Sequence, residues 1–182
     1  MKPKFILIFF IGILSASCKK DNVRSGVSVQ PDIVLESSDF QEIRKDNYSI
    51  KVHKDWYIEH DQNEVSLYIY LDTGDDFTEN INLIINPLPN SIKTLKDVEV
   101  SAKSEFLQIK GSVISSEKII TPHKEYQRMI VTAPNYGETL KYLIHYIIKD
   151  SKLYALTFTA LEKDFEEYEK IAEQIMQSFR VE

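Results

Sequence analysis

Residues 153–160 read LYALTFTA, and residues 165–179 read FEEYEKIAEQIMQSF. The first stretch is short, apolar and rich in aromatic and threonine residues, which favours a β-strand. In the second stretch the apolar residues recur three or four positions apart, which is typical of an amphipathic helix. The same spacing places Ile175 on the apolar face and Glu173 on the polar face. A strand followed at once by such a helix predicts a sheet with the helix packed on it.

The chain before this pair also reads as strands. Residues 48–52 alternate apolar and polar side chains, a period of two. Further segments rich in aromatic and β-branched residues predict the remaining strands, at 56–58, 65–71, 81–85, 112–120, 125–133 and 138–149. Pro87 and Pro89 end the strand at 81–85 because proline cannot donate a hydrogen bond to a neighbouring strand.

A second helix is predicted between Thr94 and Gly111. Thr94 is a suitable N-cap with Asp97 three residues later, and Gly111 is a suitable C-terminal stop. The apolar residues between them have helical spacing: Leu95, Val98, Ala102, Phe106 and Ile109. The short turns between consecutive strands favour antiparallel pairing. The expected fold is therefore α+β, an antiparallel β-sheet flanked by two helices.

The N-terminus carries a leader that ends at the only cysteine. Lys2 and Lys4 precede an apolar run over residues 5–14, and Ser15-Ala16-Ser17 precede Cys18. A charged start, an apolar middle and small residues are the parts of a secretory signal peptide. The run of ten apolar residues is too short for a spanning helix, which needs about 20 residues.

The Ser15-Ala16-Ser17-Cys18 junction resembles the lipobox of bacterial lipoproteins. The resemblance implies cleavage before Cys18 and lipidation of Cys18, which would become the first residue. Lys19 stands where the common inner-membrane retention signal has aspartate, so the resemblance favours the outer membrane. The alternative is an ordinary unpaired cysteine near a signal cleavage site.

Three regions are expected along the chain: a signal peptide at 1–17, the lipidated cysteine with a flexible tether at 18–44, and a globular domain at 45–182. The tether is polar, lacks a sustained period and would span on the order of 25 Å as a coil. The formal net charge is −6, and the leader contributes only basic residues to it. This acidic balance argues against nucleic acid as a partner, because a nucleic-acid-binding protein needs a basic surface.

The order of these elements resembles the PsbP-like family, whose founding members are extrinsic proteins of photosystem II and whose fold is an α-β-α sandwich. The matching strings are YSIKV at 48–52, Trp56, DFTENIN at 76–82, YALTFTA at 154–160, Phe165, Tyr168 and Ser178-Phe179. The family often has proline where this chain has His53. The photosystem members also act through N-terminal extensions that this chain does not match, so the resemblance implies a fold and not a photosystem function.

Two polar clusters are candidate metal sites. In Glu59-His60-Asp61, a continuing strand would point Glu59 and Asp61 to one face and His60 to the other, so the three would not converge. The acidic loop from Asp72 to Glu79 could bind calcium, which prefers several oxygen ligands. It lacks the spacing of an EF-hand loop, and the alternative is a solvated acidic turn.

His145 lies in a strand on the same expected face as Lys141 and Lys149. We expect an ordinary half-exposed sheet face there, and the alternative is a basic stripe that receives an anionic ligand. The sequence contains no nucleophile elbow, no zinc-protease motif and no phosphate loop. No catalytic residue, cofactor or metal site is therefore expected.

The functional expectation is a non-catalytic, lipid-anchored envelope lipoprotein that acts as a binding or assembly module. Its expected partners are the membrane, through the lipid, and an envelope protein. Two alternatives remain at this point: an enzyme whose site is scattered along the chain, and an immunity or stress-response lipoprotein.

Overall fold

The structure is a computed structural model that describes residues 24–32, 35, 38–62, 65–71, 74 and 77–182. Its main element is an eight-stranded sheet. In spatial order the strands are β1 (Arg24–Val29), β7 (Ser112–Ile120), β8 (Glu125–Asn135), β9 (Glu138–Lys149), β10 (Lys152–Leu161), β6 (Asn80–Pro87), β5 (Val65–Tyr70) and β4 (Tyr57–Gln62). All neighbouring pairs are antiparallel except β1 and β7, which run parallel.

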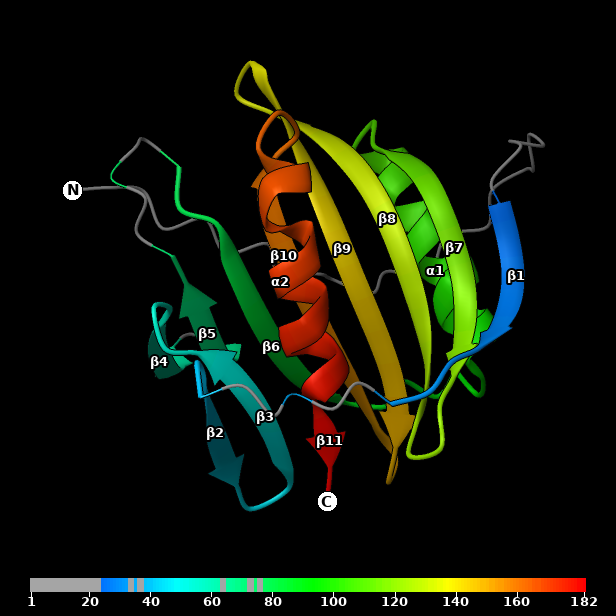
Figure 1. Cartoon of the computed structure of the whole chain (residues 1–182). Coiled ribbons are helices and arrows are strands. Elements are labelled where there is room, and N and C mark those ends of the chain that lie inside the picture. Colours follow the sequence, from blue (N-terminus) through cyan, green and yellow to red (C-terminus); the bar gives the residue numbers. More distant parts are fainter. Residues whose placement is uncertain (1–23, 33–34, 36–37, 63–64, 72–73, 75–76) are drawn as a thin grey trace.

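A second sheet of three strands lies beside the C-terminal helix (Figure 1). It contains β11 (Arg180–Val181), β3 (Tyr48–His53) and β2 (Phe40–Lys45). The predicted strand at 48–52 therefore belongs to this small sheet and not to the main one. Its inward side chains, Tyr48, Ile50 and Val52, are buried in the same core as the helix.

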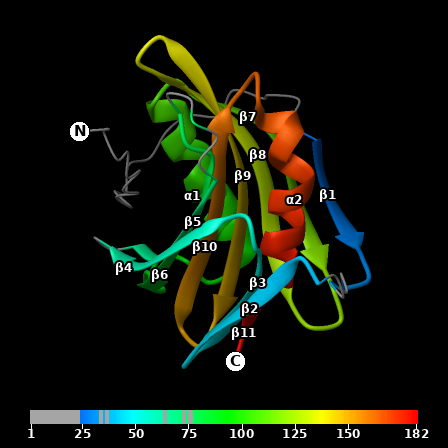
Figure 2. The same cartoon turned by 60° about the vertical axis from the view of Figure 1, so that its left-hand side comes forward.

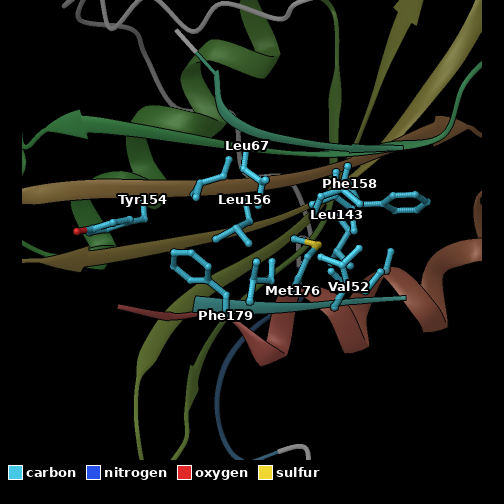
Figure 3. Close-up of a cluster of buried hydrophobic side chains, with 14 of the residues drawn as sticks. Val52, Leu67, Leu143, Tyr154, Leu156, Phe158, Met176 and Phe179 are labelled. Carbon is cyan, nitrogen blue, oxygen red and sulfur yellow. The ribbon is translucent and has the colours of Figure 1, made fainter. Parts of the chain in front are cut away.

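The two helices cover opposite faces of the main sheet, as Figures 1 and 2 show. Helix α1 (Leu95–Gln108) packs against β7, β8 and β9, whereas α2 (Phe165–Ser178) packs against β3, β9 and β10. The predicted α+β sandwich is confirmed. The core under α2 draws on both sheets, and Figure 3 shows Val52 near Met176 and Phe179 near Tyr154.

Local sequence signals explain how α1 begins and ends. The Thr94 side chain accepts a hydrogen bond from the Asp97 amide, and Asp97 Oδ2 accepts one from the Thr94 amide at 2.8 Å, a complete capping box. After the helix, Lys110 takes a left-handed φ of 61° and the Gly111 amide bonds the Phe106 carbonyl at 2.7 Å. A Cβ at Gly111 would lie 2.7 Å from the Thr132 carbonyl oxygen, so glycine is required for close packing on β8. Ile109, which was expected on the apolar stripe, is 46% exposed.

The flexible-tether interpretation of 18–44 is wrong for two parts of that segment. Residues 24–29 form β1 and pair with β7, and residues 40–45 form β2 and pair with β3. Phe40 and Ile43 also pack against the core. A domain that began at residue 45 would lose both strands. The partner of β1 is distant in sequence, so no local period reveals that pairing. Strand β2 forms a hairpin with the next strand, β3.

Candidate functional site

Charged side chains meet in the middle of the face that α2 covers. Arg128 lies on β8, and its cross-strand partner on β9 is His145. Directly paired residues of antiparallel strands point to the same face of the sheet, so both side chains face α2. Helix α2 supplies Glu169, Glu173 and Gln177, which are four positions apart and therefore share one side of the helix. We call these five residues the charged cluster.

Glu173 is the centre of the charged cluster. Its Oε2 accepts a hydrogen bond from Arg128 Nε at 2.9 Å, and its Oε1 accepts one from Gln177 Nε2 at 2.7 Å. His145 Nε2 lies 3.1 Å from the same Oε1. A second carboxylate, Glu169, lies 3.3 Å from the Arg128 guanidinium. One carboxylate therefore ties the helix to two neighbouring strands.

Burial and charge set the protonation states in the charged cluster. Burial lowers the pKa of His145 against the opposing pull of Glu173, and the ring has no exposed surface. Burial alone would raise the pKa of Glu173, but His145 and Arg128 outweigh it and hold that pKa well below its usual range. The pKa of Arg128 is raised, because the carboxylates outweigh its burial. The cluster therefore holds an ionised Glu173–Arg128 pair, with His145 coupled to the same carboxylate.

Tyr126 on β8 and Lys124, just before β8, extend the polar strip toward the end of α2. The Tyr126 ring lies 4.3 Å from the His145 ring, and burial raises the pKa of its hydroxyl. Lys124 Nζ donates to the carbonyls of Gln177 at 2.9 Å and Phe179 at 2.8 Å. A cation at this position favours the helix C-terminus, where the partial charge is negative. These contacts attach the last turn of α2 to the sheet.

A histidine beside a carboxylate is part of many acid–base sites, but here its surroundings decide its role. A catalytic base must come within hydrogen-bond reach of a substrate. His145 has no exposed surface, and α2 lies between it and solvent. Among the described residues no group of three histidine, cysteine or acidic side chains is placed to hold a metal ion. The charged cluster can therefore join the helix to the sheet, and it presents no reactive group to a dissolved molecule.

The family comparison agrees with this architecture. The PsbP family model matches residues 38–181. The chain belongs to the PsbP family. The match begins just before β2, which places that strand inside the family domain. No curated protein matches this PsbP-family chain.

Solved structures share the fold at low sequence identity. The solution structure of cyanobacterial PsbP (CyanoP) from Synechocystis is 16% identical with a TM-score of 0.61, over 81% of this chain and 95% of that one. LpqN of Mycobacterium tuberculosis, described as involved in cell envelope biogenesis, is 14% identical with a TM-score of 0.57, over 78% and 91%. A Pseudomonas aeruginosa protein of unknown function, a putative regulator by its description, is 12% identical with a TM-score of 0.54, over 76% and 94%. At these identities the likeness shows the fold.

Several predicted site residues of this PsbP-family chain lie outside the described residues. These are Cys18 and, in the acidic loop, Asp72, Asp75 and Asp76. Glu79, at the end of that loop, is buried. Lipidation and calcium binding therefore stay predictions. None of the described helices is both long enough and apolar enough to cross a bilayer.

The Glu59-His60-Asp61 segment lies on β4, as the strand interpretation requires. Glu59 is half-buried and accepts a hydrogen bond from the Tyr70 hydroxyl at 3.4 Å, whereas His60 is exposed. Their paired residues on β5 are Tyr68 and Leu67, which face opposite sides of the sheet. Glu59 and His60 therefore point apart as predicted, and the Asp61 side chain lies outside the described residues.

Two predictions about the α2 face are wrong. His145 was expected on a half-exposed sheet face and is fully buried, because α2 covers the centre of the sheet there. The basic-stripe alternative fails for the same reason. Glu173 was expected to be solvent-exposed, but its side chain is 16% exposed and paired with the sheet. Helical periodicity identifies the apolar stripe, but it does not reveal that the receiving sheet carries Arg128 and His145 inside otherwise apolar strands.

Proposed function

We propose that this chain is a lipid-anchored, non-catalytic protein of the cell envelope, whose PsbP-family domain acts as a binding or assembly module. The observation that carries the proposal is the state of the charged cluster. Of the side chains best suited to acid–base chemistry, His145 is fully buried and Glu173 is 16% exposed, and both are paired between α2 and the sheet. A domain of this kind acts through its outer surface.

The anchor part of the proposal rests on the Ser15-Ala16-Ser17-Cys18 junction. A single acyl chain gives marginal membrane binding, and more than one chain gives stable attachment. The envelope location is also supported by the similar fold of LpqN, which is described as involved in cell envelope biogenesis. Lys19 directly after the cysteine favours the outer membrane.

A pull-down from detergent-solubilised envelopes, with the chain tagged at its C-terminus, tests the module. We expect one envelope protein in stoichiometric amount, and a mass for the mature N-terminus that corresponds to an acylated Cys18. The matched variant is His145→Gln, which keeps a polar side chain in the buried position and should capture the same partner.

Two results would overturn the proposal. An unmodified Cys18, or a mature chain that starts elsewhere, removes the anchor. Conversion of a small molecule by the native chain, lost in a folded His145→Gln variant, would identify an enzyme.

A further inference from the structure

The start of β1 lies close in sequence to the proposed lipid anchor. Only five residues separate Cys18 from Arg24, the first residue of β1. An extended chain covers at most about 3.6 Å per residue, so the anchor lies within roughly 20 Å of Arg24. A lipid on Cys18 would therefore hold one particular end of the domain close to the bilayer.

Other parts of the domain meet at the same end. Arg24 pairs with Ser115 near the start of β7, and Ser112 pairs with Thr132 near the end of β8. Gly111, which follows α1, also contacts the Thr132 carbonyl. In Figure 1 the turn between β8 and β9 is at the top of the molecule, and β1 begins lower, at the right-hand edge, and runs downward beside β7.

This end exposes large apolar and aromatic side chains. Leu107 in the last turn of α1 is 60% exposed, Ile109 at its C-cap is 46% exposed, and Ile114 at the bulge of β7 is 47% exposed. Tyr136, in the turn between β8 and β9, is 89% exposed. We call these four residues the apolar end. Exposed apolar side chains that share one surface mark a protein or membrane interaction site, whereas singly scattered ones are ordinary.

The chemistry of the apolar end suits a lipid surface. Tyrosine side chains are enriched at membrane–water interfaces, where the ring meets the acyl boundary and the hydroxyl stays hydrated. Leucine and isoleucine side chains add buried apolar area, on which interfacial binding depends. The chain is acidic overall, with a formal net charge of −6, so charge attraction to anionic lipid would not hold the domain in place. An apolar contact is the remaining source of orientation.

We propose that the apolar end, Leu107, Ile109, Ile114 and Tyr136, rests on the bilayer that carries the lipid of Cys18. This inference rests on the lipid anchor of the proposed function. It fixes the orientation of the domain: the Arg24 end of β1 faces the lipid, and the Val29 end points away. The turn from Asp150 to Lys152, at the far end of the sheet, would then be presented to a partner protein.

Depth-dependent fluorescence quenching tests the orientation. The chain from Cys18 onward retains every described residue, and Cys18 is its only cysteine, so a maleimide phospholipid couples to that position alone. The coupled chain is placed on phosphatidylcholine vesicles whose acyl chains are brominated. Separate variants carry an added tryptophan, Leu107→Trp or Tyr136→Trp, and Val29→Trp is the matched control. Val29 is also apolar and is 79% exposed, but it lies at the opposite end of β1.

We expect brominated lipid to reduce the emission of the tryptophans at 107 and 136 and to leave the tryptophan at 29 unchanged. The native Trp56 is 5% exposed and gives the same background in every variant. Leu107→Asp with Ile114→Asp, added to Tyr136→Trp, should abolish the quenching because both changed positions are exposed and the fold is kept. Equal quenching at 29, 107 and 136, or none at 107 and 136, would overturn the proposed orientation.

The test separates this inference from the proposed function. Coupling through maleimide supplies the anchor whether or not the cell lipidates Cys18. Quenching at 107 and 136 with an unacylated native N-terminus would keep the lipid-binding surface and reject the lipoprotein. An acylated native N-terminus without quenching would keep the lipoprotein and reject the surface.

Discussion

Each helix buries one glutamate against the main sheet, and the two glutamates are held in different ways. Glu99 of α1 is paired with Lys96 and Lys103 of its own helix, both at 2.7 Å. Glu173 of α2 is paired with Arg128 and His145, which lie on two strands of the sheet. The Lys96 side chain is 70% exposed, whereas among the partners of Glu173 the Arg128 side chain is 16% exposed and His145 is fully buried. The charged partners of Glu99 therefore lie on its own helix, whereas the charged partners of Glu173 lie on the sheet.

The faces beneath the two helices differ accordingly. Below α1 the neighbouring strand residues are Met129 and Ile144, and below α2 they are Arg128 and His145. Because successive residues of a strand point to opposite faces, two adjacent positions on each strand serve the two helices with different chemistry. Apolar packing supports both helices. On the α2 side the charged cluster adds ion pairs between the helix and the sheet.

Apolar packing should give the largest effects, and they should be similar on the two faces. Phe106→Ala in α1 should lower the free energy of unfolding by about 3–5 kcal/mol, and Ile175→Ala in α2 by about 2–5 kcal/mol. Both side chains are fully buried, so each truncation leaves a cavity. Urea unfolding of the two variants measures the losses. A loss below about 1 kcal/mol at either position would mean that the side chain is not packed in the core between its helix and the sheet.

Glu173→Ala tests whether the charged cluster distinguishes the α2 face from the α1 face. It leaves Arg128 and His145 buried without their carboxylate, and breaking such a pair costs about 3 kcal/mol. Lys170→Ala, at an exposed position of the same helix, is the control and should stay within about 0.5 kcal/mol. Both are measured by urea unfolding at neutral pH. Equal effects of the two substitutions would show that the charged cluster does not hold α2.

The charged cluster should also make stability depend on acidity. The pKa values of His145 and Glu173 are both lowered in the folded state, so the unfolded chain binds protons first as the pH falls. Stability should therefore decrease from about pH 6.5, where an unfolded histidine titrates, and further below about pH 4.5. The slope is bounded by about 1.4 kcal/mol per pH unit for each proton.

His145→Gln identifies the histidine part of that slope. The variant should flatten the stability profile between about pH 6.5 and 5 and leave the steeper loss at lower pH. Thermal unfolding at several pH values gives both profiles. An unchanged slope in the variant would assign the acid sensitivity to other groups.

Glu99→Ala should have the smallest effect of the set. Its lysine partners remain solvated after the substitution, since the Lys96 side chain is 70% exposed. Exposed pairs within one helix contribute about 0.3–0.5 kcal/mol. Because the Glu99 side chain is 5% exposed, we expect a loss of about 1 kcal/mol, still below that of Glu173→Ala. A loss as large as that of Glu173→Ala would remove the distinction between the local and the long-range glutamate.

The sequence predicts the fold well where a signal is repeated along the chain. The aromatic and β-branched strand segments, the stripe of α2 and the capping box of α1 lead directly to a sheet covered by two helices. It predicts the candidate site poorly. His145 shares a strand face with Lys141 and Lys149, which reads as half-exposed, and the position of Glu173 on the helix says nothing about what lies opposite.

Two features were decided by the sequence itself, because they depend on neighbours along the chain. They are the boundaries of α1 at Thr94 and Gly111 and the strand periods. The tertiary structure alone decided the second sheet, the parallel pairing of β1 with β7, and the burial of Glu173 on Arg128 and His145. Each of these joins residues far apart in sequence, and the free energy of such a contact exists only after the sheet has brought its partners together.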